Sequence, residues 1–294
     1  MANLKAIRIR ITSVKSTRQI TSAMKMVAAA KLRKAQDKIV RLRPYANKLY
    51  EILVGLSQSL ADSEIPSVYS RKLAPEKILI IVITSNRGLC GAFNSNVMKE
   101  ARRVISEKYY DQYRKGNLEF FTIGKKGFDY LKKQKIRIVG EQNSLLNDLS
   151  FDNAAVVAEK IMRSFVAVEY DRVEIIYNQF KNAAVQNLVN ESFLPVETIL
   201  SGKITTKSVD YILEPGKEEI VKELIPKSLK TQFYKAVLDS FVAENGARMT
   251  AMHKATDNAT TMIRDLTLQY NKARQAAITN QILEVVSGAE ALKG

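Results

Sequence analysis

The fold is decided by residues 4–60, which read LKAIRIRITSVKSTRQITSAMKMVAAAKLRKAQDKIVRLRPYANKLYEILVGLSQSL. Stepping alternately by three and four residues from Leu4 to Leu60 visits seventeen positions, of which fourteen are apolar. A repeat of 3.5 residues over this length is typical of a left-handed coiled coil rather than of a helix on a globular core. Such a helix would run roughly 85 Å at 1.5 Å per residue. The sequence therefore predicts a long helix that pairs with a second helix.

This predicted seam has one polar gap, formed by Arg18, Thr21 and Lys25. A local irregularity of packing and a functional contact zone are equally good interpretations, since polar seam positions also fix the register of a coiled coil. Pro44 lacks a backbone donor and should bend the helix. The heptads continue beyond it, so we expect a kink rather than an end.

The basic charge of the chain is concentrated in the same helix. The net charge is +16, and residues 1–50 hold thirteen Lys or Arg against the single acid Asp37. This imbalance predicts an acidic partner surface for the helix. One cysteine, Cys90, excludes a disulfide within the chain and a cysteine-based zinc site, and one histidine, His253, leaves no His cluster for a metal or a catalytic triad. Without an apolar run near twenty residues or an apolar signal core, we expect a soluble, bacterial, cytoplasmic protein with no membrane span.

The middle of the chain changes period. The run KILIIVIT at residues 77–84 is apolar and rich in β-branched residues, as expected for a strand buried on both faces. A helix from about 95 to 115 should follow, then a strand at 118–123, a helix at 125–133, a strand at 136–139, a helix that Asp152 caps and that runs to about 168, and strands at 172–177 and 184–191. This alternation predicts a mostly parallel, Rossmann-like α/β sheet.

Helical periodicity returns from Glu218, is interrupted early by Pro226 and continues towards Gly288, a plausible stop. The expected fold is therefore a long antiparallel coiled coil of the N- and C-terminal helices with the α/β domain inserted between them. Its expected segments are an N-terminal helix at 1–61, a linker at 62–75, the α/β domain at 76–205, a connector with the start of the C-terminal helix at 206–225, and the C-terminal helix at 226–294.

Chemistry-bearing motifs are sparse. After the first strand there is neither GxGxxG nor GxxxxGK[ST], only Gly88 and Gly91, which a tight strand-to-helix turn explains better than a phosphate site does. Cys90 beside Arg87 is best interpreted as a small packing residue. The basic helix leaves one alternative open, a basic coiled-coil protein that binds nucleic acid or acts as a scaffold. Against it stand the apolar seam and the lack of a helix-turn-helix or RNP motif.

Three segments resemble the gamma subunits of bacterial F-type rotary ATP synthases. They are TRQITSAMKMVAAAKLRKAQ at 17–36, SNRGLCGAFN at 85–94 and LTLQYNKARQAAITNQILEVVSGA at 266–289, supported by SVDYILEP at 208–215. The resemblance covers essentially the whole chain. Two positions depart from the family pattern, which usually has Glu where this chain has Gln281 and Asp where it has Asn86.

The resemblance implies a rotor without catalysis or a cofactor of its own, peripheral to the cytoplasmic face of the bacterial inner membrane. Its partners would be the α and β subunits of the catalytic ring, the epsilon subunit and the c-ring, and not nucleic acid. The positions that match family contacts with the β subunits are Met24, Lys25, Glu244, Arg248 and Gln275. Those that match the tip in the apical collar are Ile278, Thr279, Ile282 and Val286, and those that match the foot on the c-ring and epsilon are Tyr211 and Glu214.

Overall fold

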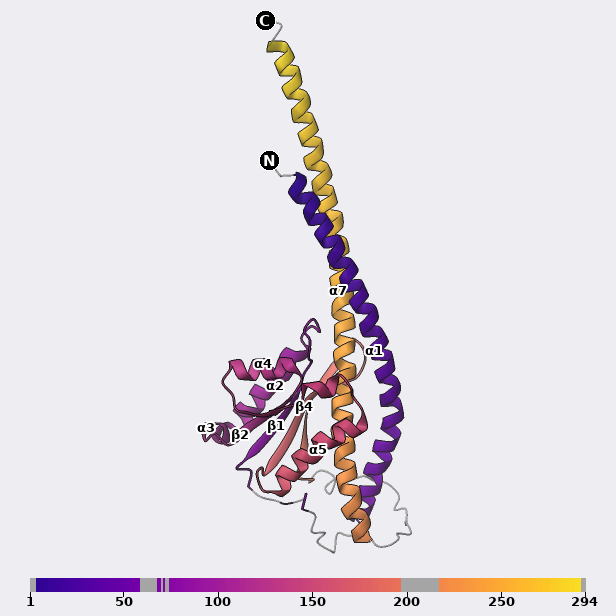
Figure 1. Cartoon of the computed structure of the whole chain (residues 1–294), viewed down its shortest axis with the longest axis vertical. Coiled ribbons are helices and arrows are strands. Elements are labelled where there is room, and N and C mark those ends of the chain that lie inside the picture. The colour runs from indigo at the N-terminus through magenta and orange to yellow at the C-terminus, as the bar shows by residue number, and fades with distance from the viewer. Residues whose placement is uncertain (1–3, 59–67, 70, 72–73, 197–216, 292–294) are drawn as a thin grey trace. The chain divides into compact units, whose positions relative to one another are not determined.

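The computed structural model describes residues 4–58, 68–69, 71, 74–196 and 217–291 (Figure 1). Contacts divide the chain into two compact units, Met1–Ala28 with Met249–Gly294, and Ala29–Arg248. Two helices, α1 (Leu4–Gln58) and α7 (Lys217–Ala291), are shared by both units. The expected boundaries at 61 and 205 lie outside the described residues, so the domain boundaries stay predictions.

The larger unit contains a five-stranded sheet in the order β3-β2-β1-β4-β5. The strands are β1 (Ile78–Ile83), β2 (Leu118–Ile123), β3 (Ile138–Glu141), β4 (Arg172–Phe180) and β5 (Gln186–Leu194). The first four are parallel, and β5 runs antiparallel to β4 at one edge. This order reverses between β1 and β4, as in doubly wound folds. The prediction of a mostly parallel, Rossmann-like sheet is thus confirmed.

Helices cover both faces of this sheet. They are α2 (Phe93–Lys108), α3 (Tyr110–Arg114), α4 (Lys125–Lys133) and α5 (Phe151–Val166), with a 3₁₀ turn, η1 (Asn143–Leu146). On one face α2 buries Val97, Ala101 and Val104 against β1 and β2. On the other face, α7 brings Phe233 against Phe193 of β5, with ring centroids 5.9 Å apart. The central strand β1 is buried along its whole length, as its unbroken apolar run predicts.

Two local expectations were wrong. The single helix expected at 95–115 breaks at Tyr109, whose φ of −130° leaves the helix and whose buried hydroxyl donates a hydrogen bond to Glu174 of β4. The cap of α5 is Ser150, whose hydroxyl accepts from the Asn153 amide at 3.3 Å, and not Asp152, which lies in the first turn. In both cases a side-chain hydrogen bond that the local sequence pattern does not reveal is made where the helix begins or ends.

In the larger unit the predicted seam of α1 is buried at Leu32, Ala35, Ile39 and Leu49, and half-buried at Leu42 and Ala46. Pro44 lies inside α1 without ending it, as expected. Pro226 also lies inside α7 and does not interrupt it, contrary to the expectation. The flanking residues Ile225 and Leu229 are buried, and this packing offsets the hydrogen bond that a proline removes. The expected pairing of the two terminal helices around an inserted α/β domain is confirmed.

Candidate functional site

The turn after β1, residues 85–92, is folded on itself by short-range hydrogen bonds. The Ser85 hydroxyl donates to the Arg87 carbonyl at 2.6 Å, and the Ser85 amide donates to Asn94 Oδ1 at 2.9 Å. Leu89 has a φ of +64° and Gly91 a φ of +61°. A left-handed backbone is costly for a branched residue such as Leu89, whereas glycine adopts it freely. The turn is therefore a tight, defined structure rather than a loose connection. We refer to it as the β1 turn.

The β1 turn lies at the reversal point of the sheet, where doubly wound proteins commonly bind their ligands. In this chain the place is taken by Arg248 of α7. Its Nη2 donates to the carbonyl oxygens of Arg87 at 3.0 Å and of Gly88 at 3.3 Å. The turn thus offers carbonyl oxygens to a cation, whereas a phosphate needs backbone amides. This geometry agrees with the interpretation of the two glycines as a turn.

Arg248 is itself held by a carboxylate one turn earlier in α7. Arg248 Nη1 and Glu244 Oε1 are 2.7 Å apart, and both side chains are nearly buried. Burial raises the pKa of Glu244, and the charges of Arg248 and of Lys31 on α1 partly offset that rise. The guanidinium therefore joins a helix, a buried carboxylate and the β1 turn, so that both side chains are engaged within the chain.

A second contact fixes the same turns of α7 to the sheet. Gly246 faces the connection between β4 and β5, and a Cβ added there would lie 3.3 Å from the Cα and the carbonyl oxygen of Ala183. Ala243, Cys90 and Phe93 form a small buried apolar cluster beside it. Residues 243–248 of α7 are therefore held in place by contacts with the β1 turn and with the β4–β5 connection. We call this contact the α7 clamp.

Cys90 and Asn86 both have structural explanations. Cys90 is buried, and burial raises the pKa of its thiol, which agrees with a packing residue rather than a reactive one. Asn86 donates from Nδ2 to the Asn143 carbonyl at 2.8 Å and accepts at Oδ1 from the Lys125 amide at 3.1 Å. An ionised aspartate could only accept, so the amide is required for both bonds. The departure from the family pattern at this position thus joins the β1 turn to α4 and η1.

In the smaller unit the two helices pair antiparallel. Thr256 Oγ1 donates to Thr21 Oγ1 at 2.9 Å, and the Arg8 guanidinium donates to the Tyr270 hydroxyl at 3.2 Å and lies 5.8 Å from the ring centroid. The polar gap predicted in the seam is thus bridged by a hydroxyl pair. The Thr21–Thr256 pair also sets the register of the two helices. Counting residues from this pair along both helices places Met24 opposite about residue 253.

The last turns of α7 extend past the start of α1. Beyond Tyr270 the side chains of Gln275, Ile278, Thr279, Ile282 and Val286 are all exposed, and Val285 is 72% exposed. Figure 1 shows this end of α7, in yellow, continuing beyond the indigo start of α1. Exposed apolar side chains on a single helix mark a surface that an external partner would cover. We call residues 276–291 the tip.

The other predicted site residues are placed as follows. Met24 and Lys25 are half-buried on α1, and Tyr211 and Glu214 lie outside the described residues. Sequence reasoning missed the partner of Arg248, because a carbonyl pair in a turn about 160 residues earlier leaves no local pattern. It also missed Gly246, whose signal was visible as a glycine inside a strongly helical run.

Across the described residues, no three His, Cys, Asp or Glu side chains come together in a way that could hold a metal ion. In the same part of the chain, no helix has both the length and the apolar character that a membrane crossing needs.

These features define a class of protein, a coiled-coil subunit in which a doubly wound domain is clamped to the C-terminal helix. The model of the family described as ATP synthase matches residues 3–292. The ATP synthase gamma chain of Flavobacterium psychrophilum is 58% identical over 294 residues, which cover all of both chains. The chain belongs to the ATP synthase gamma chain family.

Solved structures agree with this assignment. One is a chain of the central stalk and c-ring structure of the Tetrahymena thermophila mitochondrial ATP synthase, which is 26% identical, with a TM-score of 0.59 over 80% of this chain and 99% of that one. A chain of the Euglena gracilis mitochondrial ATP synthase in rotational state 3 is 24% identical, with a TM-score of 0.69 over 98% of this chain and 94% of that one. The second likeness supports the fold alone.

Proposed function

We propose that this chain is the central rotor shaft of a bacterial F-type ATP synthase, without a catalytic step or a cofactor of its own. The observation that carries the proposal is the α7 clamp. It fixes the α/β domain to the same helix whose far end is an exposed apolar tip. A rotor needs this arrangement, because torque applied to the domain must reach the helix without being lost in a flexible joint.

The proposed partners follow the length of the shaft. Tyr211 and Glu214 would meet the c-ring and the epsilon subunit, and the chain would then lie on the cytoplasmic face of the inner membrane. Ion flow would turn the c-ring and the shaft with it. Because the shaft is asymmetric, three chemically identical β sites would differ in nucleotide affinity at any moment, which is a coupling free energy carried by shape.

We propose that the shaft contacts the α and β ring both along the paired helices and at the tip. Met24, Lys25 and Gln275 offer side chains that are at least partly exposed. Glu244 and Arg248 would contact β only by sharing or leaving the contacts that hold the β1 turn. Ile278, Thr279, Ile282 and Val286 would lie in an apolar collar of the ring, which would cover the surface that the tip leaves exposed.

Purification from native membranes tests the class of function. A tagged copy of the chain should bring down the α, β and epsilon subunits in stable stoichiometry. The alternative, a nucleic-acid-binding protein, predicts recovery of nucleic acid instead. We expect DNA affinity of the isolated chain to be weak and lost at moderate salt, since only helix-surface charges are available. A sequence-preferring nanomolar complex at physiological salt would overturn the proposal.

A disulfide within the shaft tests the mechanism. The hydroxyls of Thr21 and Thr256 are 2.9 Å apart, so Thr21→Cys with Thr256→Cys should come within disulfide reach in a Cys90→Ser background. Relative sliding of the helices would expose apolar seam at roughly 25 cal/mol per Å², so the pair should rotate as one body. Oxidation should leave ATP hydrolysis and proton pumping nearly intact.

Two controls make the disulfide test decisive. The single cysteine variants report any effect of the substitutions themselves. A disulfide from the same level of the shaft to a β subunit should stop turnover on oxidation. If the link within the shaft is as damaging as the link to the ring, the rotor does not move as a rigid pair.

A further inference from the structure

Asp239 is a buried acid at the centre of the larger unit. It lies on α7 between α1 and the sheet, and its side chain is 1% exposed. Its Oδ1 atom has no hydrogen-bond partner within the described chain. Ionised carboxylates are rarely buried unless they are paired and hydrogen-bonded, because removing the charge from water is costly. Asp239 therefore requires an explanation that packing does not give.

The ion pair that Asp239 makes with a described residue is weak. Arg43 Nη2 of α1 lies 3.8 Å from Asp239 Oδ1, beyond hydrogen-bond distance, and the arginine side chain is 50% exposed. A distant, half-exposed guanidinium offsets only part of the cost of burying the carboxylate. The charge on Asp239 is thus only partly compensated by α1.

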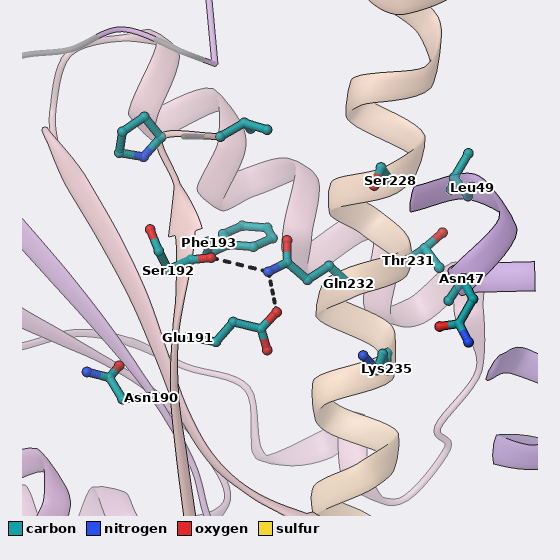
Figure 2. A pocket seen from close by; sticks show the side chains of 13 residues that line it. Asn47, Leu49, Asn190, Glu191, Ser192, Phe193, Ser228, Thr231, Gln232 and Lys235 are labelled. Atoms are coloured by element: carbon teal, nitrogen blue, oxygen red, sulfur yellow. Dashed lines mark hydrogen bonds between the residues drawn. The ribbon is translucent and has the colours of Figure 1, made fainter. Parts of the chain in front are cut away.

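A second carboxylate faces the same region from β5. Glu191 Oε1 accepts from Gln232 Nε2 at 2.6 Å, a bond drawn in Figure 2, and Glu191 Oε2 accepts from the Tyr177 hydroxyl at 3.0 Å. Gln232 Nε2 also donates to the Ser192 carbonyl at 3.2 Å. These bonds hold Glu191 in place against α7.

Four charged or titratable groups act on Asp239 from the elements packed around it. They are Arg43 of α1, Lys235 of α7, Glu191 of β5 and Tyr177 of β4. Burial raises the pKa of Asp239 to about 6, with a further rise from Glu191, while Arg43 and Lys235 act in the opposite direction. Burial, Glu191 and Asp239 all raise the pKa of Tyr177, which keeps its hydroxyl protonated as a donor.

A cavity reaches part of this group of side chains. It has a volume of about 530 Å³ and lies between α1, β5 and α7. Glu191, Gln232 and Lys235 line it together with Ala46 and Leu49 of α1, and Figure 2 shows the labelled side chains around it. Water in this cavity would contact Glu191 and Lys235 directly, and Asp239 lies one helical turn along α7 from Lys235.

We propose that Asp239 and Glu191 form a carboxyl pair that takes up one proton at Asp239, and that this proton tightens the packing of β5 of the α/β domain against α7 and α1. With Asp239 ionised, its buried charge is repelled by the partly buried carboxylate of Glu191. Protonation removes that repulsion and leaves Arg43 and Lys235 to balance Glu191 alone. The pair is thus a pH-sensitive joint between the α/β domain and the long helices, whatever partners the chain has.

The sign of the pH dependence follows from the raised pKa. The folded chain binds the proton more tightly than the unfolded chain, so the stabilisation is full below about pH 4 and is lost as the pH rises towards about 6. A pKa of about 6 against an ordinary 3.8 corresponds to roughly a hundredfold change in the unfolding equilibrium constant across this window. Asp239→Asn, which cannot ionise, should lack that change.

The test is urea unfolding of the full chain at pH values from 4 to 7.5, comparing the wild type with Asp239→Asn. The variant should match the wild type at pH 4 and be more stable by up to a hundredfold in the unfolding constant at pH 7. Hydrogen exchange should show the same pH dependence in the protection factors of the amides of β5, residues 186–194. Asp265→Asn is the matched control, because Asp265 is an exposed acid on the same helix.

Two further variants keep the test decisive if Asp239→Asn folds poorly. Arg43→Gln removes a cation and should shift the window of stability loss to higher pH. Glu191→Gln removes the facing charge and should shift the window to lower pH. If the two variants shift the window in the same direction, or if the difference between wild type and Asp239→Asn does not vary with pH, the joint does not exist and Asp239 has only a packing role.

Discussion

Two parts of the same helix, α7, have opposite surroundings. Between Ile225 and Asn245 most side chains are buried by α1 and the sheet, and Phe233, Val237 and Ala243 have no exposed surface. In the tip almost every side chain is exposed, including Ile282 at 57% and Val285 at 72%. The first part is folded as the core of a domain, and the second has apolar residues that this chain does not cover. One helix thus joins a region that its own chain stabilises to a region whose apolar side chains are exposed and form a surface suited to a partner.

The largest expected effect is on the buried part. Phe233→Ala should destabilise the isolated chain by about 3–5 kcal/mol, because it removes a fully buried ring that packs on Phe193. Ile282→Ala in the tip should change stability by less than about 0.5 kcal/mol. Urea unfolding followed by circular dichroism measures both. Equal losses would contradict the contrast between the two parts.

The α7 clamp should come next. Arg248→Ala should cost about 2–3 kcal/mol, because it leaves Glu244 as a buried carboxylate without its ion pair and frees the carbonyls of the β1 turn. Adding Glu244→Gln should recover part of the loss. Arg274→Ala, an exposed arginine nearer the tip, is the control and should change stability very little. A similar loss for both arginines would rule out the clamp.

The tip should show its effect only in the assembled enzyme. Ile282→Asp with Val286→Asp should leave the isolated chain as stable as before, since both side chains are exposed there. In the complex, two charges in an apolar collar should lower assembly or coupled proton pumping by about tenfold or more. Ile282→Val with Val286→Ile is the matched apolar control. Normal coupling in the charged variant would argue against a collar.

A pair of glycines gives the smallest effect. Gly246→Ala should destabilise the chain by about 1 kcal/mol, because the new methyl group meets the backbone of Ala183 at 3.3 Å. Gly288→Ala meets nothing within 4 Å and should instead raise helicity, by up to about 1 kcal/mol. Thermal unfolding and far-ultraviolet circular dichroism distinguish the two. The same sign for both substitutions would contradict the packing described for Gly246.

Much of the fold could be predicted from local sequence. The heptads of α1, the apolar run of β1 and the strand–helix alternation are periodic patterns, and each reports burial of a face directly. The points where helices end or continue were harder to predict. The helix after β1 ends at Tyr109 because of a hydrogen bond to Glu174, and α7 continues through Pro226 because both sides of that proline are buried. The partner of Tyr109 lies 65 residues away, and the burial around Pro226 is a property of the folded chain rather than of the local pattern.

The candidate site could likewise be predicted only in part. Residue positions at the tip and in the basic helix could be assigned from the resemblance, whereas the side chains that Arg248, Asn86 and Gly246 meet could not. Their partners are in turns and connections that are distant in sequence. The register of the helix pair was also beyond the sequence, because neighbouring registers bury similar apolar area and polar pairs such as Thr21 with Thr256 decide between them.

Patterns along the chain were enough to predict that two long helices pair, that a doubly wound domain interrupts them and that the chain resembles a rotor subunit. Periodicity and composition suffice for this, since they act along the chain and repeat over many turns. The residues that fasten the domain to α7, and the buried position of Asp239, could be found only in the folded chain. Those features depend on side chains that packing brings together from α1, α7 and the sheet, and the energy of a buried charge is set by that whole environment rather than by its neighbours in sequence.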